Sequence, residues 1–247
     1  WCQGASLVLN GKPLSADLKP GAYAVIDRAW SAGDKLALRL PMHISLRRWE
    51  KHKNAASVDR GPLTYAIRIG EKYVRVGGDD KWPAVEVHPT TAWNYGLVLD
   101  ASDPAASFEV VQPAGPLAEQ PFETAAAPIE LKAKAKKIPN WQKDRLGLVG
   151  LLAPSPVKSD EPVETITLIP MGCARLRIAS IPVIGEGPDA KEWPPAPAPA
   201  GEHQASHCFE SDTTTALSDG AVPSSSGDQG VPRFTWWPRK GTSEWVT

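Results

Sequence analysis

The stretch Ile129-Glu130-Leu131-Lys132-Ala133-Lys134-Ala135-Lys136 decides the fold class of this sequence. Apolar and charged residues alternate along it, which places Leu131, Ala133 and Ala135 on one face of a β-strand and the lysines on the other. We therefore expect a half-buried strand whose lysines face solvent and protect a sheet edge from aggregation. Nucleic-acid binding by these lysines is the weaker alternative, because no aromatic residues are interleaved with them.

Short runs with the same period of two lie on both sides of this stretch. The dipeptide Asn10-Gly11 favours a tight hairpin, and a strand at 62–69 is expected to pair with 72–76. The strongest predicted hairpin joins 163–170 to 174–179. Further strands are expected at 23–28, 35–40, 84–87, 96–99 and 107–111. Together these runs predict an all-β fold of two antiparallel, jelly-roll-like β-sandwich domains plus a truncated β-module.

The composition supports this fold class and excludes others. Hydrophobic residues make up 42% of the 247, enough for a core, while 25 prolines and the lack of helix-length blocks exclude a helix bundle. The net charge of -1 provides no positive field for a nucleic-acid backbone. No run approaches the ~20 apolar residues that cross a bilayer, so neither nucleic acid nor a membrane is an expected partner. The three cysteines lie far apart and predict neither a disulfide framework nor a zinc ribbon.

Changes in composition predict four segments. Residues 1–70 are expected to form a first sandwich, truncated at its N-terminus, and residues 71–184 a second one. Residues 185–204 are rich in proline and poor in apolar residues, which is typical of a semi-rigid linker. Residues 205–247 are too few to enclose a core of their own and are expected to be part of a larger β-module. The net charge changes from +3 over residues 1–187 to -4 beyond them, which supports a boundary at the linker.

Isolated residues with catalytic or metal-binding chemistry are present, but they do not form a set. Asp160-Glu161 is the densest acidic point, and its place between two prolines favours a solvated loop over a catalytic pair. His203, His207 and Cys208 have a spacing that suits zinc ligands on a helix, yet no helix is expected there. Cys173 follows a glycine in a predicted hairpin, where a small buried residue is favoured over a thiol nucleophile. We therefore assign no catalytic and no metal-binding residue.

Tryptophan is unusually frequent, with 10 residues against 4 Tyr and 4 Phe. Flat indole rings stack on sugar rings, although a tryptophan in a β-protein more often belongs to the core. The adjacent Trp236 and Trp237 are the best candidates for a binding platform, because neighbours on a strand face opposite sides and cannot both enter one core. Trp93 is the third candidate for carbohydrate binding.

Four separated motifs stand out when the sequence is taken as a whole: Trp30 with Gly33-Asp34 and Leu40-Pro41-Met42; Arg60-Gly61-Pro62-Leu63; Trp93-Asn94-Tyr95-Gly96-Leu97; and Pro154-Ser155-Pro156-Val157-Lys158-Ser159 leading to Thr167-Leu168-Ile169-Pro170-Met171-Gly172. Together and in this order they resemble the β-sandwich region of the β-L-arabinofuranosidase-like enzymes, glycoside hydrolase family 127. The resemblance covers about residues 1–184.

This resemblance implies that the chemistry lies elsewhere. In the family, an N-terminal (α/α)6 barrel carries a zinc-bound cysteine nucleophile, further cysteine and glutamate ligands and a glutamate acid/base, and β-sandwich domains follow it. None of the barrel motifs occurs in this sequence, so no cofactor is expected in this segment. The opening Trp1-Cys2 is neither an initiator methionine nor a signal peptide, and we expect a piece of a longer protein. Cys2 opens a predicted sandwich strand and does not inherit the nucleophile role.

The tail adds a second resemblance, since residues 205–247 look like the start of a discoidin-type carbohydrate-binding module. We therefore expect the accessory C-terminal part of a family 127-like glycosidase, whose partners are the missing barrel and arabinose-containing or related glycans. One alternative is a stand-alone carbohydrate-binding protein, and another is a structural or adhesive β-domain without a ligand. The enzyme class implies a periplasmic or extracellular location in bacteria.

Overall fold

The computed structural model describes residues 1–112, 114–144, 147–193, 203–210, 212–225, 227–228, 230–236 and 239–247. Within these residues the only helical segments are short 3-10 turns, and every named strand pairs antiparallel to its neighbours. The expected all-β class is therefore confirmed. The strands and 3-10 turns (η) are, in chain order, β1 (Ser6–Leu9), β2 (Lys12–Leu14), β3 (Leu36–Arg39), β4 (Ile44–Trp49), β5 (Ala55–Arg60), β6 (Leu63–Ile67), β7 (Glu71–Gly78), β8 (Pro83–Pro89), β9 (Tyr95–Leu97), η1 (Pro104–Ser107), β10 (Phe108–Val111), η2 (Thr124–Ala126), β11 (Glu130–Lys137), β12 (Glu164–Pro170), η3 (Met171–Cys173) and η4 (Thr214–Leu217).

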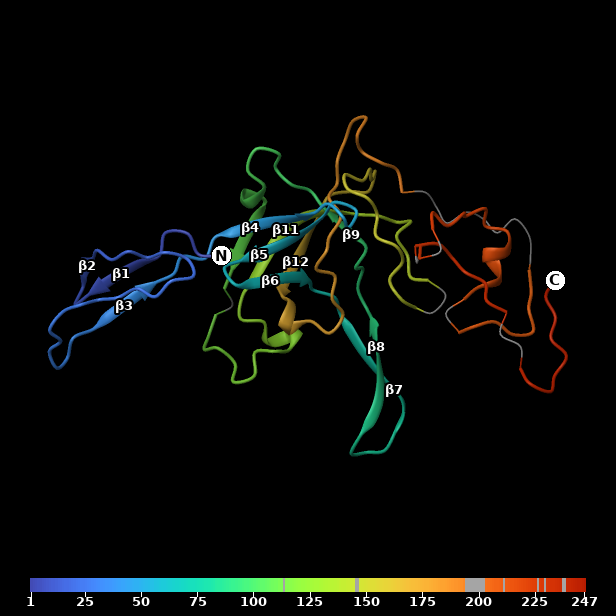
Figure 1. Ribbon diagram of the computed structural model, residues 1–247, viewed down its shortest axis with the longest axis horizontal. Coiled ribbons are helices and arrows are strands. Elements are labelled where there is room, and N and C mark those ends of the chain that lie inside the picture. Colours follow the sequence, from blue (N-terminus) through green and yellow to red (C-terminus); the bar gives the residue numbers. More distant parts are fainter. Residues whose placement is uncertain are drawn as a thin grey trace.

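A seven-stranded sheet forms the centre of the molecule (Figure 1). Its order is β10-β11-β12-β6-β5-β4, and β9 also pairs with β11. The alternation along β11 places Leu131, Ala133 and Ala135 in the core, where each is at most 3% exposed, as the sequence predicts. These side chains pack with the buried residues of β12, β6 and β5, including Leu168, Tyr65 and Val58. Leu176 and Ile178 pack against the same core from a segment without regular strands.

The position of β11 corrects one expectation. β11 lies between β10 and β12 and is an interior strand, so its lysines do not protect a sheet edge. They are paired instead with the hydroxyl groups of the next strand: Lys132 Nζ donates to Thr167 Oγ1 at 2.7 Å and Lys134 Nζ to Thr165 Oγ1 at 2.9 Å. The outer face of β11 and of the facing part of β12 is therefore polar, whereas Ala66 of β6 and Ile169 of β12 belong to a second buried cluster on that side of the sheet.

Two predicted strand pairings are wrong for related reasons. Residues 174–179 do not pair with β12, because β11 and β6 already occupy both of its edges. Residues 72–76 do not pair with β6, whose edges are taken by β12 and β5. They belong to β7, which pairs with β8 to form a two-stranded arm, defined as residues 71–89, that extends from the central sheet (Figure 1).

The N-terminal sheet has the order β2-β1-β3 and extends from another side of the central sheet (Figure 1). The predicted hairpin is confirmed: Asn10 and Gly11 have φ angles of 52° and 82°, as a type I′ turn requires. Asn10 also holds the start of β3 against this turn. Its Nδ2 donates to Asp34 Oδ1 at 2.7 Å, and its Oδ1 accepts from the Lys35 backbone N–H at 2.8 Å. The strand expected at 23–28 is absent, and Tyr23 is 96% exposed.

The central sheet draws its strands from both sides of residue 70. β4, β5 and β6 precede this position, while β9 to β12 follow it, and β6 hydrogen-bonds with β12 through Ala66 and Ile169. A further core, formed by Ile138, Trp141, Ala153 and Val157, lies beside the sheet. The division into two sandwich domains remains a prediction. The linker expected at 185–204 lies partly outside the described residues, since 194–202 are not among them.

Candidate functional site

The three tryptophans predicted to bind carbohydrate have different surroundings. Trp93 is half-buried and packs edge-on against Trp141, with ring centroids 5.2 Å apart and planes at 78°. It contacts both the central core and the core around Trp141. Trp236 lies in the C-terminal segment and is 53% exposed, while Trp237 lies outside the described residues. Their joint role as sugar platforms therefore remains a prediction, and Trp93 has a packing role in addition.

Cys173 is a buried packing residue. It is 4% exposed and packs against Ala66, Ala127 and Ile169, and its Sγ donates to the Pro121 carbonyl at 3.1 Å. Burial raises the pKa of this thiol, so it carries its proton at neutral pH.

The histidines of the tail are not joined in a ligand set. His203 Nδ1 lies 3.2 Å from the Thr247 carbonyl, and Cys208 Sγ donates to the Asp212 carbonyl at 3.7 Å. Within the part of the chain that the structure describes, no three His, Cys, Asp or Glu side chains are close enough to hold one metal ion. The same part contains no helix with the length and apolar character to cross a membrane.

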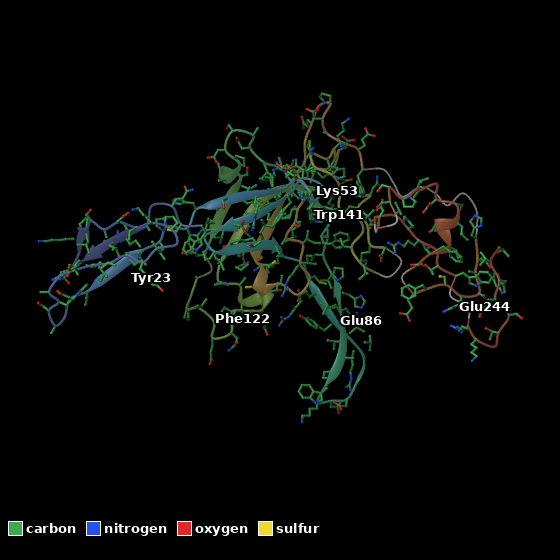
Figure 2. All side chains as sticks on the ribbon, viewed as in Figure 1. Tyr23, Lys53, Glu86, Phe122, Trp141 and Glu244 are labelled. Carbon is green, nitrogen blue, oxygen red and sulfur yellow. The ribbon has the colours of Figure 1, made fainter. Side chains whose placement is uncertain are left out.

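A first candidate surface is the leucine face of the N-terminal sheet, defined as Leu7, Leu9, Leu14, Leu36 and Leu38. Residues directly opposite each other in antiparallel strands share a face, and Leu7 is opposite both Leu14 and Leu38, while Leu9 is opposite Leu36. Leu7 is nearly buried, but Leu36 and Leu38 are 42% and 56% exposed. Figure 2 shows that this part of the chain, where Tyr23 is labelled, lies away from the central sheet. The face is thus an apolar surface open to a partner.

A second candidate is a hollow of about 1090 Å³ at the base of the arm. It lies where β6 leads into β7 and is also bounded by Gln112, by the segments 114–118 and 123–128 and by residues after β12. Figure 2 labels Phe122 on the loop before η2 and Glu86 on β8 of the arm. We call it the Tyr73 hollow, after the residue that contributes an exposed aromatic ring. Its polar lining residues include Arg68, Glu71, Tyr73, Gln112, Glu123, Thr124, Glu130 and Arg175.

One wall of the Tyr73 hollow is organised around an ion pair. Arg68 Nη2 lies 2.5 Å from Glu130 Oε1 and also donates to the Thr124 carbonyl at 3.3 Å. Desolvation raises the pKa of Glu130, but the hydrogen bond from Lys132 and the charge of Arg68 outweigh it, so the pKa of this carboxyl lies below its ordinary value. The Arg68 Nε is enclosed and has no hydrogen-bond partner among the described residues. This wall therefore contains a buried donor that is unsatisfied.

A second part of the lining is organised around Glu71. Its Oε1 accepts from the backbone N–H groups of Arg175 and Leu176 at 2.9 and 3.2 Å, and its Oε2 accepts from the Tyr73 hydroxyl at 3.0 Å. Desolvation and this bond to Glu71 raise the pKa of the Tyr73 phenol, which stays neutral and keeps donating. One carboxylate thus holds the ring of Tyr73 and the backbone at Arg175 in a fixed relation, although the ring is 55% exposed.

The residues of this hollow were not predicted from the sequence. The one local pattern that concerns them is the period of two along 71–75, which places Glu71 and Tyr73 on the same face of a strand. The bond from Arg175 to Glu71 spans 104 positions, and no local pattern indicates it. Distant segments also meet at a hollow of about 580 Å³ between residues 149–151 and the tail around Phe209 and Arg233.

Comparison with known proteins identifies a family for the first part of the chain. Residues 1–42 match the family model described as β-L-arabinofuranosidase, GH127 middle domain, so this region is related to GH127. No curated protein sequence gives a significant match.

Solved structures provide weaker similarities. One is a glycoside hydrolase with 21% sequence identity and a TM-score of 0.43, and the match covers 75% of this chain and 26% of that one. Another is a GH127 β-arabinofuranosidase with 15% sequence identity and a TM-score of 0.44, and the match covers 72% of this chain and 23% of that one. A third is a GH127 β-L-arabinofuranosidase from Geobacillus stearothermophilus with 20% sequence identity and a TM-score of 0.40, and the match covers 72% of this chain and 24% of that one. The chain spans about a quarter of the length of these proteins.

Proposed function

We propose that this chain is an accessory, non-catalytic β-region of a GH127-like glycoside hydrolase, and that it braces a catalytic (α/α)6 barrel formed by other residues of the same protein. The observation that carries the proposal is the match of residues 1–42 to the GH127 middle domain. No residue of this chain is assigned a role in bond cleavage. The zinc-dependent chemistry that the family resemblance implies belongs to the barrel.

The leucine face supports this proposal because it lies within the matched residues. Covering an exposed leucine side chain with an apolar partner is favourable, by about 1.5–3 kcal/mol for each side chain that becomes fully buried. Leu36 and Leu38 alone are exposed enough to contribute on this scale when a partner covers them. The face is also preformed, since Asn10 ties the β1–β2 turn to Asp34 ahead of β3. Such a surface binds an apolar partner with little ordering cost.

The first test is the coding sequence upstream of Trp1. The proposal expects an in-frame region for a helical domain of about 350–450 residues, a size that suits a barrel of paired helices. This region is expected to contain the cysteine and glutamate residues of a zinc site. A start codon directly before Trp1, with no such region in frame, would overturn the proposal.

The second test uses the full-length protein and the leucine face. The double variant Leu36→Glu/Leu38→Glu places two charges on this face, while Ala37→Glu places one on the opposite face of the same strand and serves as the control. The proposal expects the double variant to lower the Tm of the full-length protein by several degrees and to reduce hydrolysis of an aryl β-L-arabinofuranoside. The control is expected to change neither. Equal effects of both variants would mean that the leucine face does not contact the barrel.

A further inference from the structure

The Tyr73 hollow has no role in the proposed function, and its lining combines features that point to a ligand. We propose that it binds a short neutral saccharide. This inference rests on the geometry of the hollow alone, so it stands or falls independently of the barrel.

The ring of Tyr73 supplies a preorganised flat surface. It is 55% exposed, yet its hydroxyl is held by Glu71, which is itself held by two backbone N–H groups after β12. A sugar ring presents a face of C–H groups that stacks on such an aromatic ring, as the positive edge of one group meets the negative face of the other. Because the ring is fixed before the ligand arrives, binding does not have to immobilise it.

The polar groups around the ring match the hydroxyl groups of a sugar, each of which both donates and accepts. The exposed Arg175 side chain contributes guanidinium donors to this lining. Glu123 supplies carboxylate acceptors, and Gln112 supplies one amide donor and one acceptor group.

The charges of the lining select the class of saccharide. Both signs of charge line the hollow, with Arg68 and Arg175 accompanied by Glu71, Glu123 and Glu130, so no field of one sign attracts an anionic or cationic ligand. An apolar ligand is disfavoured because it would desolvate these groups without bonding to them. The volume exceeds the ~300–1,000 Å³ range of small-molecule pockets, which leaves room for an oligosaccharide longer than a single ring.

Titration calorimetry and amide chemical shifts of the whole chain test the proposal. The probes are neutral arabinobiose, xylobiose and cellobiose, with digalacturonate as the anionic counterpart. We expect one or more neutral disaccharides to bind, with shift changes in β7 and around residue 175. Tyr73→Ala is expected to weaken binding about tenfold or more, and Arg175→Ala severalfold. Tyr73→Phe retains the ring and is expected to retain most of the affinity.

The control variant is Trp82→Ala, which removes another exposed aromatic ring of the same arm, 72% exposed and outside the hollow. It is expected to bind like the unaltered chain. The unaltered shifts of strands β11 and β12 check that each variant is folded. The proposal is overturned if no neutral probe binds at 10 mM, a ceiling chosen as roughly ten times a ~1 mM Kd, if Tyr73→Ala binds as tightly as the parent, or if digalacturonate binds more tightly than all neutral probes.

Discussion

Trp93 is a residue at which the two roles of a tryptophan, core packing and sugar stacking, make different demands. Its ring edge meets Trp141, and it joins two buried clusters. Its place in the sequence motif with Asn94 and Tyr95 does not distinguish these roles, because both need an aromatic side chain on a strand boundary. The tertiary contact with Trp141, 48 positions away, is what assigns packing to it.

Replacement of Trp93 by Ala measures this packing role. We expect Trp93→Ala to lower the free energy of unfolding by about 2–4 kcal/mol, because a large ring leaves a cavity between two clusters. Urea unfolding followed by far-UV circular dichroism provides the value. Trp82→Ala, at a 72% exposed position, is expected to stay within about 0.5 kcal/mol of the parent. A loss no larger than that of the control would show that Trp93 is not a packing residue.

Glu130 gives the chain a pH-dependent contribution to stability. Its pKa is held below the ordinary value by Lys132 and Arg68, so the folded state favours the carboxylate. This contribution is fully present above the ordinary pKa of a glutamate and is lost as the pH falls through the lower folded value. We therefore expect the stability of the chain to fall between about pH 5 and about pH 3, and to fall less steeply in Glu130→Gln.

Urea unfolding at several pH values checks this expectation. The matched control is Glu119→Gln, the same change at an exposed position of the 112–128 segment. Its pH dependence is expected to follow the parent. If the free energy of unfolding changes with pH equally in the parent and in Glu130→Gln, the ion pair of Glu130 with Arg68 does not contribute to acid stability.

At the scale of elements, the arm depends on one glycine in its turn. Gly78 has a φ of +73°, and a Cβ at this position would lie 2.2 Å from the Trp82 carbonyl oxygen. The neighbouring Gly77 does not have a positive φ, and a Cβ at its position would contact only Ala84 Cβ, at 3.9 Å. The two adjacent glycines therefore differ in what they permit, although the sequence presents them as equivalent.

The pair Gly78→Ala and Gly77→Ala tests this difference. Gly78→Ala is expected to destabilise the arm by about 1–2 kcal/mol or more, from the left-handed backbone and the clash with carbonyl oxygen. Amide hydrogen exchange should then accelerate in residues 71–89 while β11 and β12 keep their protection. Gly77→Ala is expected to leave exchange nearly unchanged. Faster exchange across the central sheet in Gly78→Ala would mean that the arm is integral to that sheet.

The strands also show which structural properties can be predicted from the sequence and which cannot. Strict alternation predicts β11 correctly and orients Leu131 to the core, because one strand's two faces are a local property. The partner of a strand is a non-local property. Residues 174–179 alternate as well as β11 does, yet they form no regular strand: both edges of β12 are occupied, and Ile178 instead accepts a backbone hydrogen bond from Ile67 of β6. The Tyr73 hollow was missed for the same reason, because Arg175 reaches Glu71 only through the tertiary fold.

At the scale of the whole molecule, the leucine face predicts how the chain behaves alone. Open apolar surface of this kind binds hydrophobic dyes such as ANS. We expect the unaltered chain to enhance ANS fluorescence at neutral pH while its far-UV spectrum stays that of a β-protein. Leu36→Glu/Leu38→Glu is expected to reduce the enhancement by about half or more, whereas Ala37→Glu on the opposite face changes it little. Equal fluorescence from both variants would place the dye-binding surface elsewhere.

The pairing of β6 with β12 also has a consequence for synthesis on the ribosome. Ile67 is opposite Leu168, so β6 leaves the ribosome about 100 residues before the strand that covers its edge. At roughly 5–20 residues per second, that interval lasts on the order of 5–20 s. During this time β4, β5 and β6 can form a meander, but one edge, carrying the buried side chains Tyr65 and Ile67, stays open to other nascent chains. The order of the strands along the chain thus leaves an unpaired strand edge during translation, to which another nascent chain can add a strand.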